Sequence, residues 1–127
     1  MQEHLVRAEQ RRRSETPNGV MTTSASPTLG GSSGLSLWWV EMAAGASGPE
    51  HIFDSEQLWS VVDGSASVTV DGTSLELSAG DTVVLPAGVP RRIRARTALR
   101  VAVCGAGNAV ASVPGESQSR GVPPWIA

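Results

Sequence analysis

Residues 45–64 read GASGPEHIFDSEQLWSVVDG, and residues 80–91 read GDTVVLPAGVPR. Each segment opens on a glycine, contains a short apolar run, and reaches a turn residue or a proline-rich corner. Glycine and proline at such positions mark tight turns, and short apolar runs between them are typical of strands. The two segments therefore predict short strands joined by tight turns.

The same pattern continues on both sides of these segments. Asp63-Gly64 and Asp71-Gly72 are dipeptides of favoured hairpin turns. Pro17-Asn18-Gly19 is a further turn signal ahead of a predicted strand. Many short strands with turns between them indicate a sandwich or barrel, so the predicted fold class is all-β. We expect strands within residues 14–25, 35–42, 55–62, 65–70, 73–77, 82–85, 91–96 and 99–104.

Residues 35–42 form a strong strand candidate in which apolar side chains occur at alternate and at neighbouring positions. Leu35, Leu37 and Trp39 fall on one face, and Trp38 and Val40 fall on the other. Because both faces carry apolar groups, we expect this strand to be covered on both sides. Either tryptophan could face the interior.

Length and composition limit the possible functions. The chain has 127 residues, enough for one domain, and a net charge of −2. This balance gives no reason to expect a nucleic acid or an anionic membrane as partner. All ten basic residues are arginine and tyrosine is missing, which excludes lysine Schiff-base and tyrosine chemistry. Cys104, the only cysteine, excludes an internal disulfide and a cysteine-rich zinc site, and we interpret it as an inert core thiol.

The two ends of the chain differ in character from the middle. Residues 1–13 are predicted to form a polar leader without the apolar run of a secretory signal, and no segment is long enough to span a bilayer, so cytoplasmic residence is expected. Residues 106–127 form the C-terminal tail, rich in turn residues. The tail ends in the apolar pair Trp125-Ile126, which we expect to pack on the barrel.

In spacing, the two segments quoted above resemble the two signature motifs of the cupin superfamily. The resemblance implies that residues 14–105 form a single-domain, antiparallel double-sheet cupin barrel of the jelly-roll type. In that family the first motif supplies two histidines and a glutamate to a metal, and the second adds a histidine. Here His51 matches the first ligand, whereas Phe53, Gln57 and Arg91 occupy the other three positions. Family habit also implies a homodimer.

The resemblance places the face that carries His51 toward the barrel interior. Strand alternation then directs Gln57 and Arg91 to the same space. We take His51, Arg91 and Gln57 as candidate catalytic residues. The candidate substrate-binding walls are apolar: Phe53, Trp59, Val61, Ile93 and one of Trp38 and Trp39. A mostly apolar cavity with a few convergent polar groups is the usual form of a small-molecule site.

This set of residues predicts a site without metal or other cofactor. A tightly bound transition metal needs about three or four protein donors. Gln57 is a weak neutral ligand, and Arg91 is a cation that would repel a dication. His4 lies in the polar leader, and the neighbouring carboxylates of Glu50 and Glu56 are predicted to point away from the interior.

Arg91 and His51 each allow a structural and a functional interpretation. Arg91 could form a buried ion pair with Glu50 or Glu41, or its guanidinium could recognise an anionic or enolate oxygen. His51 could be a neutral imidazole hydrogen-bonded to Gln57, or a general acid or base. The remaining arginines after residue 91 could bind phosphate, but their alternation favours a solvated strand face.

We interpret the chain as a metal-independent enzyme that acts on a small hydrophobic metabolite by acid–base chemistry. Lyase, isomerase or cyclase activity in biosynthesis would suit such a pocket. Two alternatives remain at this point: a small-molecule-binding module without turnover, and a metal-dependent oxygenase with atypical ligands. The expected partners are the small molecule and a second copy of the chain.

Overall fold

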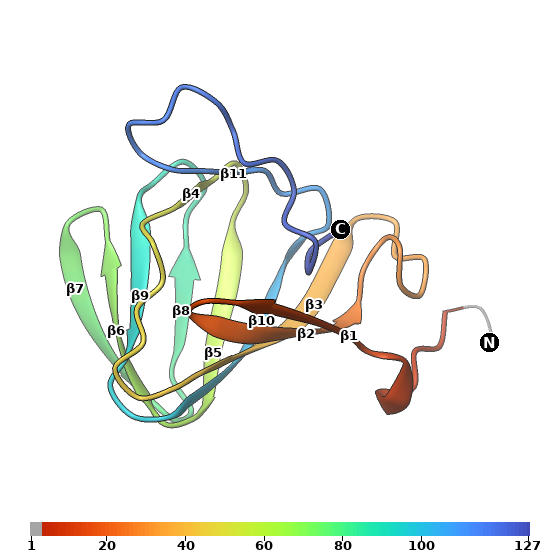
Figure 1. Cartoon of the computed structure of the whole chain (residues 1–127), viewed down its shortest axis with the longest axis horizontal. Helices are drawn as coiled ribbons and strands as arrows, with labels where there is room; N and C mark the ends of the chain where they lie inside the picture. Colours follow the sequence, from red (N-terminus) through yellow and green to blue (C-terminus); the bar gives the residue numbers. More distant parts are fainter. Residues whose placement is uncertain (1–3) are drawn as a thin grey trace.

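The computed structural model describes residues 4–127, and nearly all of its regular structure is β-strand, as predicted (Figure 1). A single 3-10 turn precedes the strands, and every strand pairing is antiparallel. The elements in chain order are η1 (Ala8–Gln10), β1 (Arg12–Thr16), β2 (Gly19–Ala25), β3 (Leu35–Met42), β4 (Ile52–Phe53), β5 (Gln57–Asp63), β6 (Ser65–Val70), β7 (Thr73–Ser78), β8 (Thr82–Leu85), β9 (Arg91–Ala95), β10 (Leu99–Ala106) and β11 (Ala111–Ser112).

The strands form three sheets that enclose one interior. The large sheet has the order β1-β2-β3-β10-β5-β8, the small sheet has the order β7-β6-β9, and β11 pairs with β4. In Figure 1 the small sheet lies at the left, and the large sheet extends from β8 to β1 at the right. Strands distant in sequence, such as β3 and β10, are direct neighbours. The result is the double-sheet jelly-roll barrel that the sequence predicts.

Of the two predicted Asp-Gly hairpin turns, Asp71-Gly72 is formed between the paired strands β6 and β7. Asp63-Gly64 is not a hairpin turn, because it links β5 of the large sheet to β6 of the small sheet and these two strands do not pair. Asp71 and Gly72 both have positive φ, 48° and 83°, which a type I′ turn between β6 and β7 requires. Gly64 has a φ of 88°, and a Cβ at this position would lie 2.1 Å from the carbonyl oxygen of Ala98. Only glycine fits there, because the turn and the close backbone approach leave no room for a side chain.

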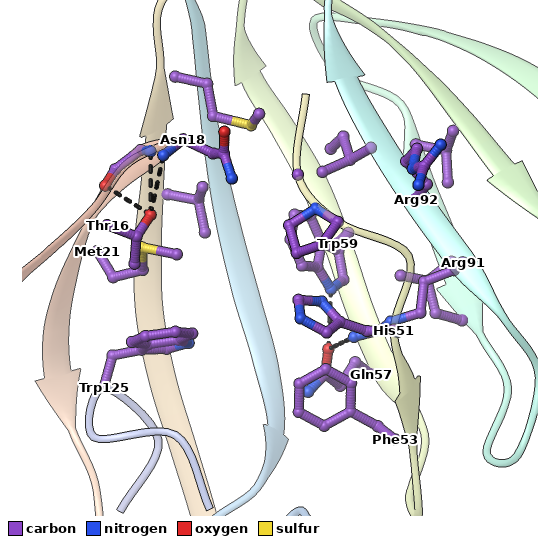
Figure 2. Close-up of a pocket in the computed structure, with 18 of the residues that line it drawn as sticks. Thr16, Asn18, Met21, His51, Phe53, Gln57, Trp59, Arg91, Arg92 and Trp125 are labelled. Carbon is purple, nitrogen blue, oxygen red and sulfur yellow. Dashed lines mark hydrogen bonds between the residues drawn. The ribbon is translucent and has the colours of Figure 1, made fainter. Parts of the chain in front are cut away.

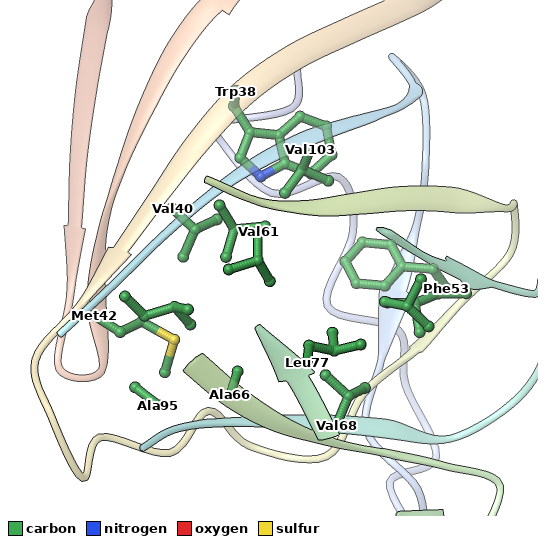
Figure 3. Close-up of a cluster of buried hydrophobic side chains, with 14 of the residues drawn as sticks. Trp38, Val40, Met42, Phe53, Val61, Ala66, Val68, Leu77, Ala95 and Val103 are labelled. Atoms are coloured by element: carbon green, nitrogen blue, oxygen red, sulfur yellow. The ribbon is translucent and has the colours of Figure 1, made fainter. Parts of the chain in front are cut away.

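The core lies between the inward faces of the two larger sheets (Figure 3). Along β3 the buried residues alternate with exposed ones, so that Trp38 and Val40 point inward. They pack with apolar side chains of β6, β9 and β10, among which Val68, Ala95 and Val103 are at most 1% exposed. This alternation selects Trp38 as the interior tryptophan.

The outward face of β3 is not covered within the chain, so the expectation of burial on both sides is wrong. Leu37 is 41% exposed and lies in register with Cys104 of β10, which in turn lies opposite Leu58 of β5. Cys104 is half-buried on this outward face and is therefore not part of the core. The sequence pattern alone could not reveal this, because apolar residues alternate in both registers.

The C-terminal tail fastens onto the first three strands of the large sheet. Ile126 is fully buried, and its carbonyl oxygen accepts a hydrogen bond from the Ser36 hydroxyl. The Thr23 hydroxyl donates to the Trp125 carbonyl oxygen at 2.6 Å. Arg12, the first residue of β1, donates from Nη2 to the Ala127 carbonyl oxygen at 2.7 Å. The first strand begins at residue 12, two residues before the predicted start of the barrel.

Residues 4–127 contain no helix with the length and apolar character needed to cross a membrane.

Candidate functional site

A cavity of about 260 Å³ lies inside the barrel. Figure 2 shows its two sides: His51, Gln57 and Arg91 lie on one, and Met21 and Trp125 face them from the other. The first side is built from β5, β9 and the start of β4, whereas the second is built from β2 and the C-terminal tail. The cavity therefore has a polar wall and an apolar wall.

The backbone holds His51 and Arg91 directly opposite each other. The His51 N–H donates to the Arg91 carbonyl at 2.9 Å, and the Arg91 N–H donates to the His51 carbonyl at 2.9 Å. Residues that exchange both bonds in an antiparallel pair send their side chains to the same face. The Pro86-Ala87-Gly88 corner stabilises this arrangement, because the Gly88 N–H donates to the Phe53 carbonyl at 2.8 Å.

Gln57 connects the polar groups of this wall. Its Oε1 accepts hydrogen bonds from Arg91 Nη2 at 2.7 Å and from Trp59 Nε1 at 3.1 Å. Both donors lack acceptor capacity, so they fix the orientation of the Gln57 amide. Its Nε2 is buried without an acceptor among residues 4–127. The hydrogen bond between His51 and Gln57, considered from the sequence, is not formed.

Arg91 is buried without a carboxylate partner. Its side chain is 6% exposed, and its guanidinium carbon lies 4.3 Å from the centroid of the Phe53 ring. Within the described part of the chain, no carboxylate lies within 4.0 Å of it, and Glu41 instead approaches Arg100 at 3.9 Å. The proposed ion pair of Arg91 with Glu50 or Glu41 is therefore not formed. Burial lowers the pKa of Arg91 to about 10, which still leaves it charged at neutral pH.

His51 is held in its neutral form. Burial lowers the pKa of its imidazole, and the positive charges of Arg91 and Arg120 lower the pKa further. Its ring lies edge-on to Phe53, with 6.0 Å between the ring centroids. Since the ordinary pKa of histidine is close to neutrality, a lowered pKa leaves the imidazole able to accept a proton at pH 7.

Most of the predicted wall residues line the cavity. Phe53, Trp59, Ile93 and Trp38 do so. Val61 does not: it is 1% exposed and belongs to the core beside the cavity. Trp39 also does not, because β3 alternation turns its ring outward, where Arg100 stacks on it.

The sequence analysis missed the apolar wall opposite His51. Met21 of β2, Asn18 of the β1–β2 turn and Trp125 of the tail all line the cavity. The apolar pair at the end of the tail was a signal that this segment packs on the barrel, but not that it reaches the cavity. Arg92, assigned to the solvated strand face, is exposed and also lies at the cavity rim.

The donor set of the cavity does not fit a metal ion. Nowhere in residues 4–127 do three or more histidine, cysteine, aspartate or glutamate side chains come together in a possible metal site. In the cavity, His51 is the one good donor, and Gln57 Oε1 already receives two N–H groups. The guanidinium of Arg91 would repel a dication that approached them.

The cupin-domain family profile matches residues 38–104, which span both segments quoted at the start of the sequence analysis. The chain belongs to the cupin family. None of the curated proteins matches it at a significant level. The family assignment agrees with the fold, whereas cupins differ too widely for the fold to determine an activity.

Solved cupin structures agree with this fold. An RmlC-like cupin from Shewanella frigidimarina is 24% identical, with a TM-score of 0.70 over 83% of this chain and 91% of that one. KdgF from a Halomonas species is 21% identical, with a TM-score of 0.69 over 80% and 90% of the two chains. A salicylate 1,2-dioxygenase from Pseudoaminobacter salicylatoxidans, solved with gentisate, is 20% identical, with a TM-score of 0.71. The match covers 85% of this chain but 32% of that dioxygenase.

Proposed function

We propose that this cupin acts on a small, largely apolar organic molecule by metal-independent acid–base chemistry inside the barrel. One observation carries the proposal: the cavity pairs a neutral imidazole with a buried guanidinium that has no carboxylate partner among residues 4–127. Arrangements that hold a proton acceptor beside a preorganised cation are suited to removing a proton and stabilising the charge that develops.

In this mechanism His51 accepts a proton from a carbon atom next to a carbonyl group of the substrate. The carbon–hydrogen electron pair moves toward the carbonyl oxygen, where Arg91, oriented by its hydrogen bond to Gln57 Oε1, stabilises the negative charge. His51 then returns the proton to the same carbon or to another position. Isomerisations, eliminations and cyclisations that proceed through an enolate begin with this step, which fits the lyase, isomerase or cyclase class.

The apolar wall would set the size and shape of the substrate. The volume of about 260 Å³ lies just below the range of roughly 300–1,000 Å³ typical of drug-sized ligands, so a molecule with one or two rings would fill it. Trp38, Trp59 and Trp125 offer flat surfaces on different sides of the cavity. Such surfaces would hold a flat substrate in one orientation.

A second candidate is a binding module without turnover. It is favoured by the fact that, apart from Arg91 and Arg92, His51 is the one titratable side chain among the described lining residues. Proton transfer by one group requires that it act both as base and as acid. A binding module requires no such cycle.

The two candidates can be separated before the natural substrate is known. We would incubate the protein in D₂O with a panel of small ring-bearing carbonyl compounds and follow carbon-bound deuterium and products by NMR. An enzyme should catalyse exchange at the carbon next to the carbonyl, and His51→Ala should slow it by about 10²–10⁴-fold. His4→Ala is the matched control, because His4 is exposed. Binding with no exchange and no product for any compound would favour the binding module.

A further inference from the structure

We propose that the molecule held in this cavity is a monocarboxylate, with its carboxylate against Arg91 and its apolar body against the tail side of the cavity. This inference rests on the proposed function and names the substrate class. It states that the negative charge is already present when the molecule binds, and does not arise only during the reaction.

The first argument is the charge of the lining. Arg91 and Arg92 line the cavity, and no aspartate or glutamate from residues 4–127 does so. Arg120 adds positive charge close enough to affect His51, although its own guanidinium is paired with Glu116. A buried charge is stable only when paired or hydrogen-bonded, and the described chain supplies Arg91 with no anion. An anionic ligand would complete that pair.

The second argument is the set of unused hydrogen-bond donors. Of the Arg91 nitrogens, Nη2 alone donates to a side chain among the described residues. Gln57 Nε2 is buried and has no acceptor within residues 4–127, and Figure 2 shows it on the side of the amide turned away from Arg91. Because Nε2 is buried and turned away, it is not available to a ligand that lies at Arg91, and the unused donors are the remaining N–H groups of the Arg91 guanidinium. A carboxylate presents two oxygens that only accept hydrogen bonds, which matches a guanidinium.

The third argument is the contrast with the opposite wall. Met21, Trp38 and Trp125 present apolar surface. The polar side chain of Thr16 is occupied within the β1–β2 turn, where its hydroxyl bonds to Gly19 and accepts from the Asn18 N–H. The part of the ligand that meets these three side chains is therefore apolar, and the Asn18 amide on the same side is a neutral polar group, so that the molecule has one charged end.

His51 lies where it can act on such a ligand. It is directly opposite Arg91 in the backbone pairing and shares its face. When the carboxylate of the ligand lies at Arg91, the ligand carbon next to that carboxylate faces the His51 imidazole. Removing a proton from the adjacent carbon forms an imidazole N–H bond and delocalises the electron pair onto the carboxylate oxygens, where the same donors stabilise it.

The test compares ligands that differ only in charge. Isothermal titration calorimetry would measure the binding of benzoate and trans-cinnamate, of the matching benzamide and cinnamamide, and of phenyl phosphate. We expect at least one carboxylate to bind at least about tenfold more tightly than its amide, as a charged hydrogen bond to buried donors predicts. Phenyl phosphate should bind more weakly than the carboxylates, because its second charge has no second buried cation to pair with.

Two variants and one control locate the effect. Arg91→Met should remove the preference for carboxylate over amide. Gln57→Glu, which keeps the shape of the side chain, should weaken carboxylate binding by at least about tenfold through charge repulsion. Arg100→Met is the control, since Arg100 also stacks on an aromatic ring but lies on the outer face. It should leave the preference unchanged, and thermal melting of each unliganded variant would confirm that it folds.

Failure of this inference differs from failure of the proposed function. The monocarboxylate inference would be overturned by equal binding of amides and carboxylates, by tighter binding of phenyl phosphate, or by a carboxylate preference that is retained in Arg91→Met. In each of these cases, His51-dependent exchange of neutral compounds would leave the acid–base function standing. Conversely, a carboxylate preference without any exchange would support this inference and leave a binding module. No binding by any of the carboxylates would also overturn the inference.

Discussion

Two arginines of this chain make the same contact in opposite surroundings. Arg91 lies over the Phe53 ring inside the barrel, and Arg100 lies over the Trp39 ring on its outer face, each with 4.3 Å between the guanidinium carbon and the ring centroid. The side chain of Arg100 is 45% exposed and approaches Glu41, whereas Arg91 is 6% exposed and has no carboxylate partner in the described chain. The stacking contact is equal, so the difference in surroundings decides what each cation can do.

Outside the barrel, water and Glu41 compensate the charge, and the stack is ordinary surface packing. Inside, burial alone lowers the pKa of Arg91 to about 10. A shift of this size corresponds to a cost on the order of 3 kcal/mol for keeping the group charged. That is a sizeable part of the roughly 5–15 kcal/mol by which a domain is stable. A charge kept at such a cost is expected to serve a ligand.

The largest effect is expected when Arg91 and its neighbours in the cavity are replaced by metal ligands. The triple variant Phe53→His, Gln57→Glu and Arg91→His, together with the existing His51, should bind about one zinc or manganese ion per chain, whereas we expect the wild-type protein to bind none. Elemental analysis after dialysis would measure this. Adding His51→Ala to the triple variant should reduce binding again. Stoichiometric metal in the wild-type protein would contradict our account of the donor set.

Removing each arginine charge should affect stability differently. Arg91→Met keeps the length and apolar stem but deletes the buried charge, and Gln57 Oε1 keeps its bond from Trp59. We expect the free energy of unfolding to rise by about 1–3 kcal/mol. Arg100→Met should change it by no more than about 0.5 kcal/mol. Urea unfolding of both variants would test this, and a strong loss of stability in Arg91→Met would show that the charge supports the fold.

His51 should make the stability of the fold depend on pH, in a way that the residues of the outer face do not. Its pKa is lower in the folded chain than in the unfolded chain, so the unfolded state binds more protons as the pH falls below about 7. This contribution to stability is complete above that pH and is lost as the pH falls through the folded-state pKa. Melting temperatures between about pH 8 and pH 5 should fall more for the wild type than for His51→Asn. If His4→Asn flattened the profile equally, His51 would not be its source.

The smallest effect is expected at the outer pair. The Arg100 and Glu41 side chains are 45% and 58% exposed and lie 3.9 Å apart at their closest charged atoms. Glu41→Gln should therefore change the free energy of unfolding by less than about 0.5 kcal/mol, and it should do so only at low salt. Chemical denaturation at two salt concentrations would measure it. An effect comparable to that of Arg91→Met would remove the distinction between the two environments.

The sequence was sufficient for the fold and for the polar wall of the site. Turn glycines such as Gly64 and Gly72 allow few alternatives, because their backbone conformations exclude other residues. Strand alternation correctly brought His51, Gln57 and Arg91 to one interior. The turns and the strand alternation follow from local rules that the sequence states directly, whereas the choice of the interior face came from the resemblance to the cupin motifs.

The remaining parts of the site depend on contacts that local rules do not contain. Neighbouring tryptophans at positions 38 and 39 leave the register of β3 open, and only the pairing with β10 decides that Trp38 points inward. Trp125 reaches the cavity because hydroxyl groups of β2 and β3 hold the tail, across about a hundred residues of sequence. The partner of a buried amide such as that of Gln57 likewise follows from the three-dimensional packing.

The anchoring of the tail has a consequence for biosynthesis. Residues 125–127 leave the ribosome long after β1, β2 and β3, to which they bind. During translation the nascent barrel therefore has a gap in the wall that Trp125 later fills. Since β10 ends at Ala106, synthesis at roughly 5–20 residues per second leaves the barrel in this unfinished form for about one to four seconds. A chaperone would encounter an open hydrophobic interior during that interval, and the ligand would meet a completed binding site only after synthesis has passed residue 125.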